Sequence, residues 1–364
     1  MIRPLIALLL ILGHVPVAAA ARRRAVQHPA AAIPPAAIVI AASQAAEAAL
    51  KAGVPAVQIA VSHRGRVIYS GAFGMSDRES ATAATDRSVM QVGSIAKPFT
   101  AAAILRLAER GALSLDDRIE KFVPEFNSRG ATITLRHLLS HTSGVSAPPP
   151  DHYSPLTREQ FIKSVNAQPL AFPPGTKYVY SNAGFSLLGH AIESITGRSY
   201  ADFIHSEFAV PLGLIDTGVC GTYNMPRPGG YNVSQGKPLP VPAVEMSVPF
   251  AAGALCSTAT DLARWSHLLA TGRVMLPASY ATMTTPGRLA DNTLTPYGLG
   301  VFVGKQLAHP SVSHTGAIPG FLSTLIYFSD QEIAVSVIIN ALPSPVPAQS
   351  IALAVAQHAL EAVP

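Results

Sequence analysis

Residues 91–100 read Gln91-Val-Gly-Ser-Ile-Ala-Lys-Pro-Phe-Thr100 and place a serine and a lysine three positions apart, with a proline directly after the lysine. On a helix, residues i and i+3 share one face, so the amine of Lys97 is within reach of the hydroxyl of Ser94. Proline costs a helix least near its first turn. We therefore expect Ser94 at the start of a helix over 94–110, where free N–H groups and the helix dipole favour developing negative charge.

The chemistry of this pair suggests a nucleophile with its base. A serine hydroxyl is a weak nucleophile until a neighbouring group takes its proton. Lysine, with an ordinary pKa of about 10.4, accepts that proton at neutral pH only where burial or a nearby cation lowers its pKa. The spacing alone is a weak signal, because Ser234 and Lys237 have the same spacing in a Gly/Pro-rich segment where a helix is not expected.

Two further short motifs point to a site. Tyr180-Ser-Asn182 precedes an expected helix over 182–195, and there it presents a phenol together with an amide that both donates and accepts hydrogen bonds. The alternatives are a half-buried core tyrosine and an asparagine that caps the helix. His314-Thr-Gly316 lies on an expected strand, where histidine and threonine hold an anionic group and glycine leaves room for a ligand. The alternative is an ordinary strand that ends in a bulge.

Strand patterns occur at both ends of the chain, and helical patterns dominate the middle. β-branched runs are followed by turn residues at 54–61, 66–72, 311–316, 321–328 and 332–340. Helical composition is found at 38–50, 94–110, 156–167, 182–195, 199–207, 259–270 and 348–362, and the proline-rich stretch 226–242 is expected to be a stiff loop.

This order of elements predicts an α/β (α+β) fold. One antiparallel sheet is built from both chain ends and flanked by the terminal helices, and a largely helical region is inserted into it. We expect the sheet region to comprise residues 36–84 plus 290–364, and the helical region residues 85–289. A cleft between two such regions is a natural small-molecule site.

The first 21 residues resemble a secretory signal peptide. Arg3 precedes an apolar run at 5–12 and small residues at 17–21, and the run is too short for a membrane span. The alternative is an uncleaved anchor. Cleavage would leave 22–35 as a leader, remove the charge of Arg3 and lower the formal net charge from +5 to +4. We expect a periplasmic or secreted protein without a membrane span in the mature chain, and no nucleic-acid partner, because no basic stripe with interleaved aromatics is present.

Several single residues leave alternatives open. Cys220 and Cys256 are the two cysteines of the 364-residue chain, and they form either a disulfide or two separate buried thiols. His137 and His141 are four residues apart, as in some zinc sites, but we favour support of a loop near the site. Trp265, the only tryptophan, is expected in the core. No metal or cofactor is expected.

The three motifs, in this order, resemble the serine β-lactamase and penicillin-binding-protein superfamily, whose related signatures are Ser-x-x-Lys, Ser-Asp-Asn and Lys-Thr-Gly. Tyr-Ser-Asn and His-Thr-Gly are similar to the branch of class C β-lactamases, D-alanyl-D-alanine carboxypeptidases and esterases. Residues 138–144, 173–182 and 252–265 are also similar to this branch, although Ala254 stands where a second glycine is common. The resemblance implies a β-lactamase/transpeptidase-like fold.

The resemblance also implies roles for the residues of the first two motifs. Ser94 would be the nucleophile that is acylated, and Lys97 would help to remove its proton. Tyr180 would pass that proton to the leaving group, and Asn182 would bind an amide of the substrate's side chain. The function implied is that of an exported serine hydrolase.

For the third motif, the resemblance implies contacts with the substrate. His314 and Thr315 would face its carboxylate, Gly316 would leave it room, and the N–H groups of Ser94 and Ala317 would form the oxyanion hole. A charged His314 predicts that turnover of carboxylate-bearing substrates weakens from pH 6 to 8. The expected substrates are β-lactams or D-alanyl peptides; the alternatives are a small-ester esterase and a penicillin-binding sensor with little turnover.

Overall fold

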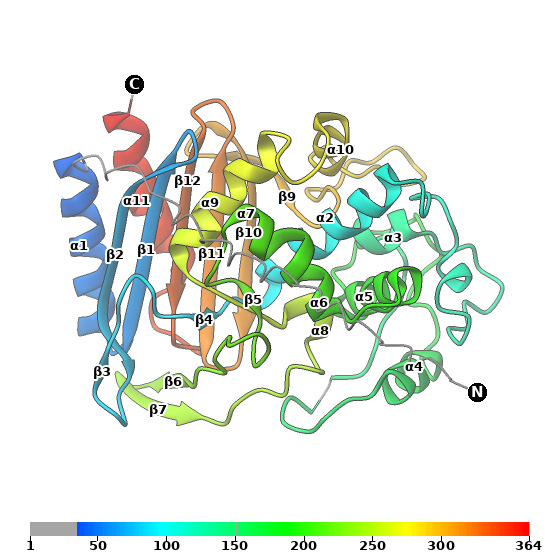
Figure 1. Ribbon diagram of the computed structural model, residues 1–364, viewed down its shortest axis with the longest axis horizontal. Helices are drawn as coiled ribbons and strands as arrows, with labels where there is room; N and C mark the ends of the chain where they lie inside the picture. Colours follow the sequence, from blue (N-terminus) through cyan, green and yellow to red (C-terminus); the bar gives the residue numbers. More distant parts are fainter. Residues whose placement is uncertain (1–34, 150, 364) are drawn as a thin grey trace, which may run out of the picture. The chain divides into compact units, whose positions relative to one another are not determined.

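The computed structural model describes residues 35–149 and 151–363 (Figure 1). The expected signal peptide at 1–21, and the leader at 22–35 except for Pro35, lie outside the described residues. The main sheet has seven strands in the order β3-β2-β1-β12-β11-β10-β9, and all of its neighbours are antiparallel. Its strands are β1 (Ala56–His63), β2 (Arg66–Asp77), β3 (Thr82–Ala83), β9 (Phe302–Gln306), β10 (His309–Ile318), β11 (Phe321–Phe328) and β12 (Ile333–Ile339).

The two ends of the chain meet in the centre of this sheet, which confirms the expected architecture. β1 pairs with β12 from Val57 opposite Ile339 to His63 opposite Ile333. Side chains alternate between the faces of a strand. Val57 therefore packs into the core on one face, while Ala56 belongs to the core on the other face.

Helices cover both faces of the sheet (Figure 1). α1 (Ala36–Lys51) and α11 (Ala348–Ala362) lie side by side on one face, where buried alanines such as Ala46 and Ala356 allow close packing. α9 (Ala259–Ala270) lies on the opposite face; its N-cap Thr258 accepts a hydrogen bond from Asp261 N–H. The buried Trp265 of α9 stacks on Phe99, with ring centroids 3.8 Å apart, as the core assignment predicted.

The segment between the strands is largely helical. In the part of the chain that the structure describes, no helix combines the length and apolar character needed to cross a membrane. The described residues belong to a single compact unit, and the proposed limits of a sheet region and a helical region stay a prediction. The remaining helical elements are η1 (Gly93–Ile95), α2 (Ala96–Glu109), η2 (Ile119–Lys121), α3 (Leu135–Leu139), α4 (Arg158–Asn166), α5 (Asn182–Thr196), α6 (Tyr200–Ile204), the π-helical turn η3 (His205–Ala209), α7 (Val210–Leu212), α8 (Phe250–Gly253) and α10 (Pro277–Met283).

The expectation of a loop over 226–242 is wrong, because this stretch contains a hairpin of β6 (Gly230–Ser234) and β7 (Lys237–Val241). Proline is tolerated in β7 because this strand has a partner on one side only. The second Ser-x-x-Lys pair, Ser234 and Lys237, faces across the hairpin turn and is not on a helix.

A small sheet in the order β4-β8-β5 adjoins the helix that carries Ser94. Its strands are β4 (Met90–Gln91), β5 (Gly218–Val219) and β8 (Leu255–Ser257). Cys220, directly after β5, forms a disulfide with Cys256 of β8, with a Cα–Cα distance of 5.1 Å. The choice that the sequence left open is therefore settled in favour of the disulfide.

Candidate active site

Ser94 lies in the 3-10 turn η1, directly before α2. The residues in front of it are fixed to two different sheets. Val92 N–H donates to the carbonyl of Leu255 in β8 at 3.0 Å, and Val92 O accepts from the hydroxyl of Ser323 in β11 at 2.8 Å. The backbone entering the helix is therefore rigid, and Ser94 is held at the helix start, where the first N–H groups have no intrahelical partner.

Gly316 has a different role from the one expected. A Cβ added to Gly316 would collide with Val92 O and with Ser323 Oγ. The space that we assigned to a ligand is thus filled by the protein's own backbone, and that expectation is wrong. Glycine at this position lets β10 approach the turn that carries Ser94.

Lys97 is completely buried, and its ammonium position is surrounded by three acceptors. Nζ lies 2.9 Å from Ser94 Oγ, 2.8 Å from Asn182 Oδ1 and 2.8 Å from Ala252 O. Within the described residues, no carboxylate forms an ion pair with it. Burial lowers the pKa of Lys97 well below its ordinary value. As a neutral amine it donates to the two carbonyl oxygens and keeps its lone pair for the Ser94 proton.

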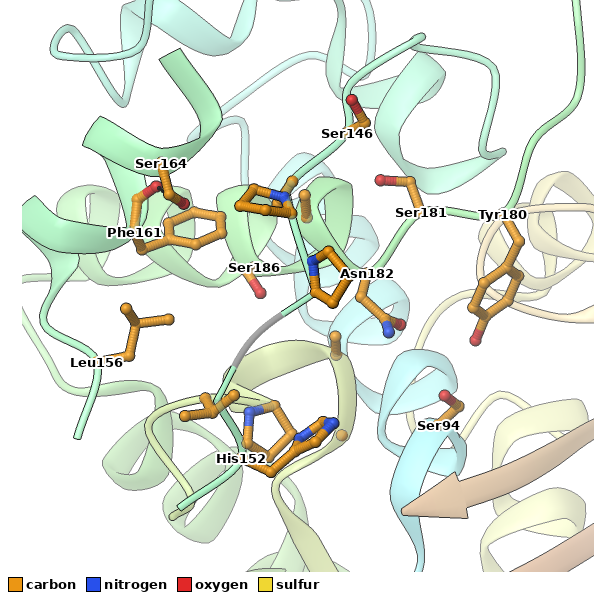
Figure 2. A pocket seen from close by; sticks show the side chains of 18 of the residues that line it. Ser94, Ser146, His152, Leu156, Phe161, Ser164, Tyr180, Ser181, Asn182 and Ser186 are labelled. Atoms are coloured by element: carbon orange, nitrogen blue, oxygen red, sulfur yellow. Dashed lines mark hydrogen bonds between the residues drawn. The ribbon is translucent and has the colours of Figure 1, made fainter. Parts of the chain in front are cut away.

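Tyr180 faces Ser94 across the mouth of a cavity (Figure 2). Lys97 Nζ lies 4.7 Å from the centre of its ring. Although Tyr180 keeps 38% of its surface exposed, desolvation raises its pKa above the ordinary value of a phenol. The phenol is protonated at neutral pH with or without this shift, so it is available as a proton donor.

Asn182 is the first residue of α5, and the preceding serine is the cap. Ser181 Oγ accepts from Gly184 N–H at 3.2 Å and donates to Val145 O at 2.7 Å. Because Asn182 Oδ1 accepts from Lys97, the orientation of the amide is set. Its Nδ2 group is left to donate a hydrogen bond toward the cavity that Asn182 lines.

His314 is in the motif but does not face the cleft as a cation. It is 1% exposed, its Nδ1 donates to Thr315 O at 2.7 Å, and its Nε2 accepts from the hydroxyl of Tyr297 at 2.8 Å. Burial, followed by the charge of Lys97, lowers its pKa to about 3. The expectation of a charged His314 is therefore wrong, since the ring is neutral from pH 5 upward.

The residues that follow His314 on β10 alternate between the exposed and the buried side of the strand. Thr315 and Ala317 are exposed, whereas Gly316 is buried. A Cβ on Gly93 would lie 3.0 Å from Ala317 N, so the turn carrying Ser94 and this part of β10 are in direct contact. The backbone N–H groups of Ser94 and Ala317 thus lie on adjacent segments, as the expectation of a shared oxyanion hole requires.

The match to known proteins agrees with this arrangement. The family model described as Beta-lactamase matches residues 38–360 of this chain. The chain belongs to the Beta-lactamase family. It is 30% identical over 263 residues to the putative penicillin-binding protein PbpX of Bacillus subtilis (strain 168), a match that covers 72% of this chain and 64% of that protein. The chain thus spans somewhat less than two thirds of the length of this curated relative.

Solved structures of similar fold include two with more than a quarter of their residues identical. The octameric penicillin-binding protein homologue from Pyrococcus abyssi superposes with a TM-score of 0.77 at 27% identity, over 89% of this chain and 77% of that chain. The D-stereospecific amidohydrolase from Streptomyces sp. gives a TM-score of 0.73 at 29% identity, over 89% and 98% of the two chains. The Beta-lactamase family fold therefore extends over most of the described chain.

In this member of the Beta-lactamase family, His141 contributes more to the candidate site than the sequence suggested. His141, 1% exposed, accepts from Ser181 N–H through Nδ1 at 3.1 Å, and its carbonyl accepts from Val179 N–H at 3.0 Å. These two bonds lie on either side of Tyr180, and the ring of His141 packs against the tyrosine with centroids 4.2 Å apart. His141 is therefore a positioning residue for the phenol.

The zinc alternative for His137 and His141 finds no support. His137 Nδ1 accepts from Thr134 N–H in a capping box at the start of α3. Among the residues that the structure describes, no group of three or more His, Cys, Asp or Glu side chains is arranged to hold a metal ion.

Replacing His141 by leucine is expected to lower kcat by about 10- to 100-fold with KM changed less than about threefold, because the phenol loses its alignment. Asparagine at 141 should restore most of the rate, since it tolerates the φ of +58° at this position and offers an acceptor to Ser181 N–H. Steady-state kinetics, with thermal unfolding as a check on folding, measures both. Equal losses in the leucine and asparagine variants would contradict the positioning role.

The pH dependence of the activity follows from the lowered pKa values of Lys97 and His314. Lys97 acts as a base only when neutral, and its pKa is lowered, so activity is lost as pH falls through that pKa and is retained above it. His314, with a pKa of about 3, does not titrate between pH 6 and 8. We expect kcat/KM for an uncharged ester to stay flat or to rise between pH 6 and 8. A profile that falls over this range would show that a protonated group other than Tyr180 is required.

Proposed function

We propose that this chain is a serine hydrolase that carries the acyl group of its substrate on Ser94. The observation that supports this most directly is the 2.9 Å contact between Ser94 Oγ and Lys97 Nζ, made by a fully buried amine without a carboxylate partner in the described residues. A surface lysine would stay charged, and it would be no base at neutral pH.

Acylation proceeds in three proton transfers. Lys97 accepts the proton of Ser94 while Oγ forms a bond to the carbonyl carbon, and the N–H groups of Ser94 and Ala317 stabilise the oxyanion. Loss of one such donor typically costs about 10²- to 10³-fold in rate. Tyr180 then donates its proton to the leaving nitrogen or oxygen as the bond to the carbonyl carbon breaks, and it regains a proton from the Lys97 ammonium.

Deacylation reverses these roles. A water molecule takes the place of the leaving group, and the Tyr180–Lys97 pair accepts its proton while the water oxygen attacks the ester. The serine oxygen leaves and recovers a proton from Lys97, so the carboxylic acid is released and the enzyme returns to its starting state. The rate of this step distinguishes a hydrolase from a sensor that stays acylated.

For the substrate, we propose β-lactams or D-alanyl peptides as the first class. Two similar proteins, one named as a putative penicillin-binding protein and the other as a D-stereospecific amidohydrolase, support it. Uncharged small esters are the second class, and the neutral state of His314 favours them, because this histidine offers no positive charge to a substrate carboxylate. We further propose export to the periplasm or the medium, which the disulfide between Cys220 and Cys256 supports.

One panel of substrates tests these proposals. The purified chain is incubated with a chromogenic cephalosporin, a D-Ala-D-Ala peptide and a p-nitrophenyl ester, and each reaction is followed by turnover and by intact mass. A transient adduct on Ser94 with steady turnover is the expected result. A long-lived adduct without turnover would identify a sensor, and the absence of any Ser94 adduct would overturn the proposed function.

A further inference from the structure

A large cavity of about 910 Å³ opens beside Ser94 and continues past Asn182 between α4 and α5 (Figure 2). Ser94 and Tyr180 lie at one end and Phe161 at the other. We call the far part the side chamber. It is lined by Leu156, Phe161, Ser164, Ser186 and Val248.

The direction of the side chamber relative to the reacting atoms follows from α5. Asn182 and Ser186 are four residues apart and share one face of this helix, so Ser186 lies about 6 Å deeper than Asn182. Asn182 Nδ2 is free to bind a carbonyl of the substrate. In Figure 2, Asn182 lies between Ser94 and Ser186, so a substrate group bound by Asn182 is directed toward the side chamber.

Ser186 lies in the wall of the side chamber, and its hydroxyl is unpaired among the described residues. Its side chain is 5% exposed, points into the cavity in Figure 2, and has no hydrogen-bond partner within the described residues. Ser164, by contrast, donates to Phe161 O at 2.7 Å. The other side chains that line the side chamber are hydrocarbon, and the burial of apolar groups against them is favourable.

The charge of the side chains that line the cavity also limits which acyl group can bind. Among the described residues that line the cavity there is no lysine or arginine, and Asp151 is the only acidic one. The carboxylate of Asp151 accepts from Tyr153 N–H and from Ser154 Oγ, and these hydrogen bonds lower its pKa, so it is ionised at neutral pH. An anionic acyl group would meet this negative charge and would find no lysine or arginine to pair with; His152 is the one histidine among the described residues of the lining.

We propose that the side chamber holds the acyl part of the substrate, and that this part is large, apolar and uncharged, as in aryl or medium-chain acyl esters and amides. The proposal rests on the function proposed for Ser94 and adds the acyl specificity. It commits to no leaving group, since the nitrogen of an opened β-lactam ring, which stays attached to the acyl part, the nitrogen of a departing D-alanine and the oxygen of a departing alcohol are all equally compatible with it.

Acyl length is tested with p-nitrophenyl acetate, butyrate and hexanoate. Full burial of one methylene is worth up to roughly fourfold in kcat/KM, and we expect a rise of at least about tenfold from acetate to hexanoate. The p-nitrophenyl monoester of adipic acid, equal in length to the hexanoate but with a terminal carboxylate, should react at least about tenfold more slowly than the hexanoate. A flat series, or an adipate ester that equals the hexanoate, would overturn the proposal.

Filling the chamber tests its location. Ser186→Leu should remove the advantage of the hexanoate over the acetate, while Ser194→Leu, the same change at an exposed position of α5 outside the cavity, should leave it intact. Ser164→Leu on α4 is a second filling variant if Ser186→Leu does not fold. Equal losses for acetate and hexanoate in a folded filling variant would count against the chamber.

A binding measurement separates this proposal from the proposed function. Ser94→Ala cannot be acylated at this position, and the shift of its thermal unfolding by each intact ester reports binding alone. Preference for hexanoate over acetate in this variant, abolished by adding Ser186→Leu, would support the chamber even if no turnover is found. Turnover through Ser94 with no such preference would leave the function standing and remove the chamber.

Discussion

Ser94→Ala is expected to lower kcat/KM for every substrate of the enzyme by at least about 10⁴-fold, because the oxygen that forms the acyl bond is removed. The fold should be unaffected, since the Ser94 hydroxyl contacts Lys97 and takes no part in the contacts of Val92 that fix the turn. Activity on the best ester of the panel and the intact mass after a β-lactam challenge measure the effect.

The chain supplies a matched control for this variant. Ser234 is followed by Lys237 at the same spacing, but the pair lies on the β6–β7 hairpin. Ser234→Ala is expected to retain the rate to within about twofold, as is usual for exposed sites outside a mechanism. Residual turnover of the Ser94 variant above about one per cent of the original rate would mean that another group attacks the substrate, and the mechanism would have to be abandoned.

Lys97→Met is expected to reduce kcat/KM by about 10³- to 10⁴-fold, the upper part of the roughly 10²- to 10⁴-fold that general acid–base catalysis contributes. Methionine has a similar length and no basic atom, and it leaves Asn182 Oδ1 and Ala252 O without their donor. The acylation rate, followed by stopped-flow absorbance with the p-nitrophenyl ester, isolates this step from deacylation.

Arginine at the same position distinguishes a base from a simple cation. A guanidinium stays protonated in proteins, so Lys97→Arg keeps a positive charge but cannot accept a proton from Ser94. If Lys97 acts as a base, Lys97→Arg should react as slowly as Lys97→Met. If the arginine variant instead kept most of the rate, the positive charge and not the lone pair of Lys97 would be what the reaction uses.

Much of the fold could be predicted because its strongest elements have local signals. The β-branched run at 332–340 corresponds to β12, Ile333–Ile339, and the helix expected at 259–270 has these bounds, with Thr258 as its cap. The hairpin β6–β7 was missed because its prolines are typical of loops. The strands of the small sheet were missed because each has only two or three residues, too few for a periodic pattern.

The part of the candidate site that depends on the spacing of residues along one helix could be predicted. The part that lies on a strand was predicted less well. Ser94 and Lys97 are neighbours on one helical turn. In His314-Thr-Gly316 the alternation of a strand sends His314 and Gly316 to the buried face, and Thr315 to the exposed one. That rule was available from the sequence and would have argued against a charged His314 in the cleft.

Other parts of the site depend on residues brought together by the fold, which no local pattern reveals. His141 supports Tyr180 from a different segment, through a left-handed backbone that the sequence gives no reason to expect. The side chamber needs Leu156, Phe161 and Ser186 from separate elements. The disulfide partner of Cys220 is reached only because β5 pairs with β8.

The pairing of β1 with β12 has a consequence for how the molecule is made. Val57 can pair with Ile339 only after residue 339 has left the ribosome, and closing so long a loop slows folding. Until then the β1–β2 hairpin has an unpaired edge, and β10, which carries the proposed oxyanion donor Ala317, has no finished sheet to join. A nascent chain should thus remain inactive until β12 has emerged.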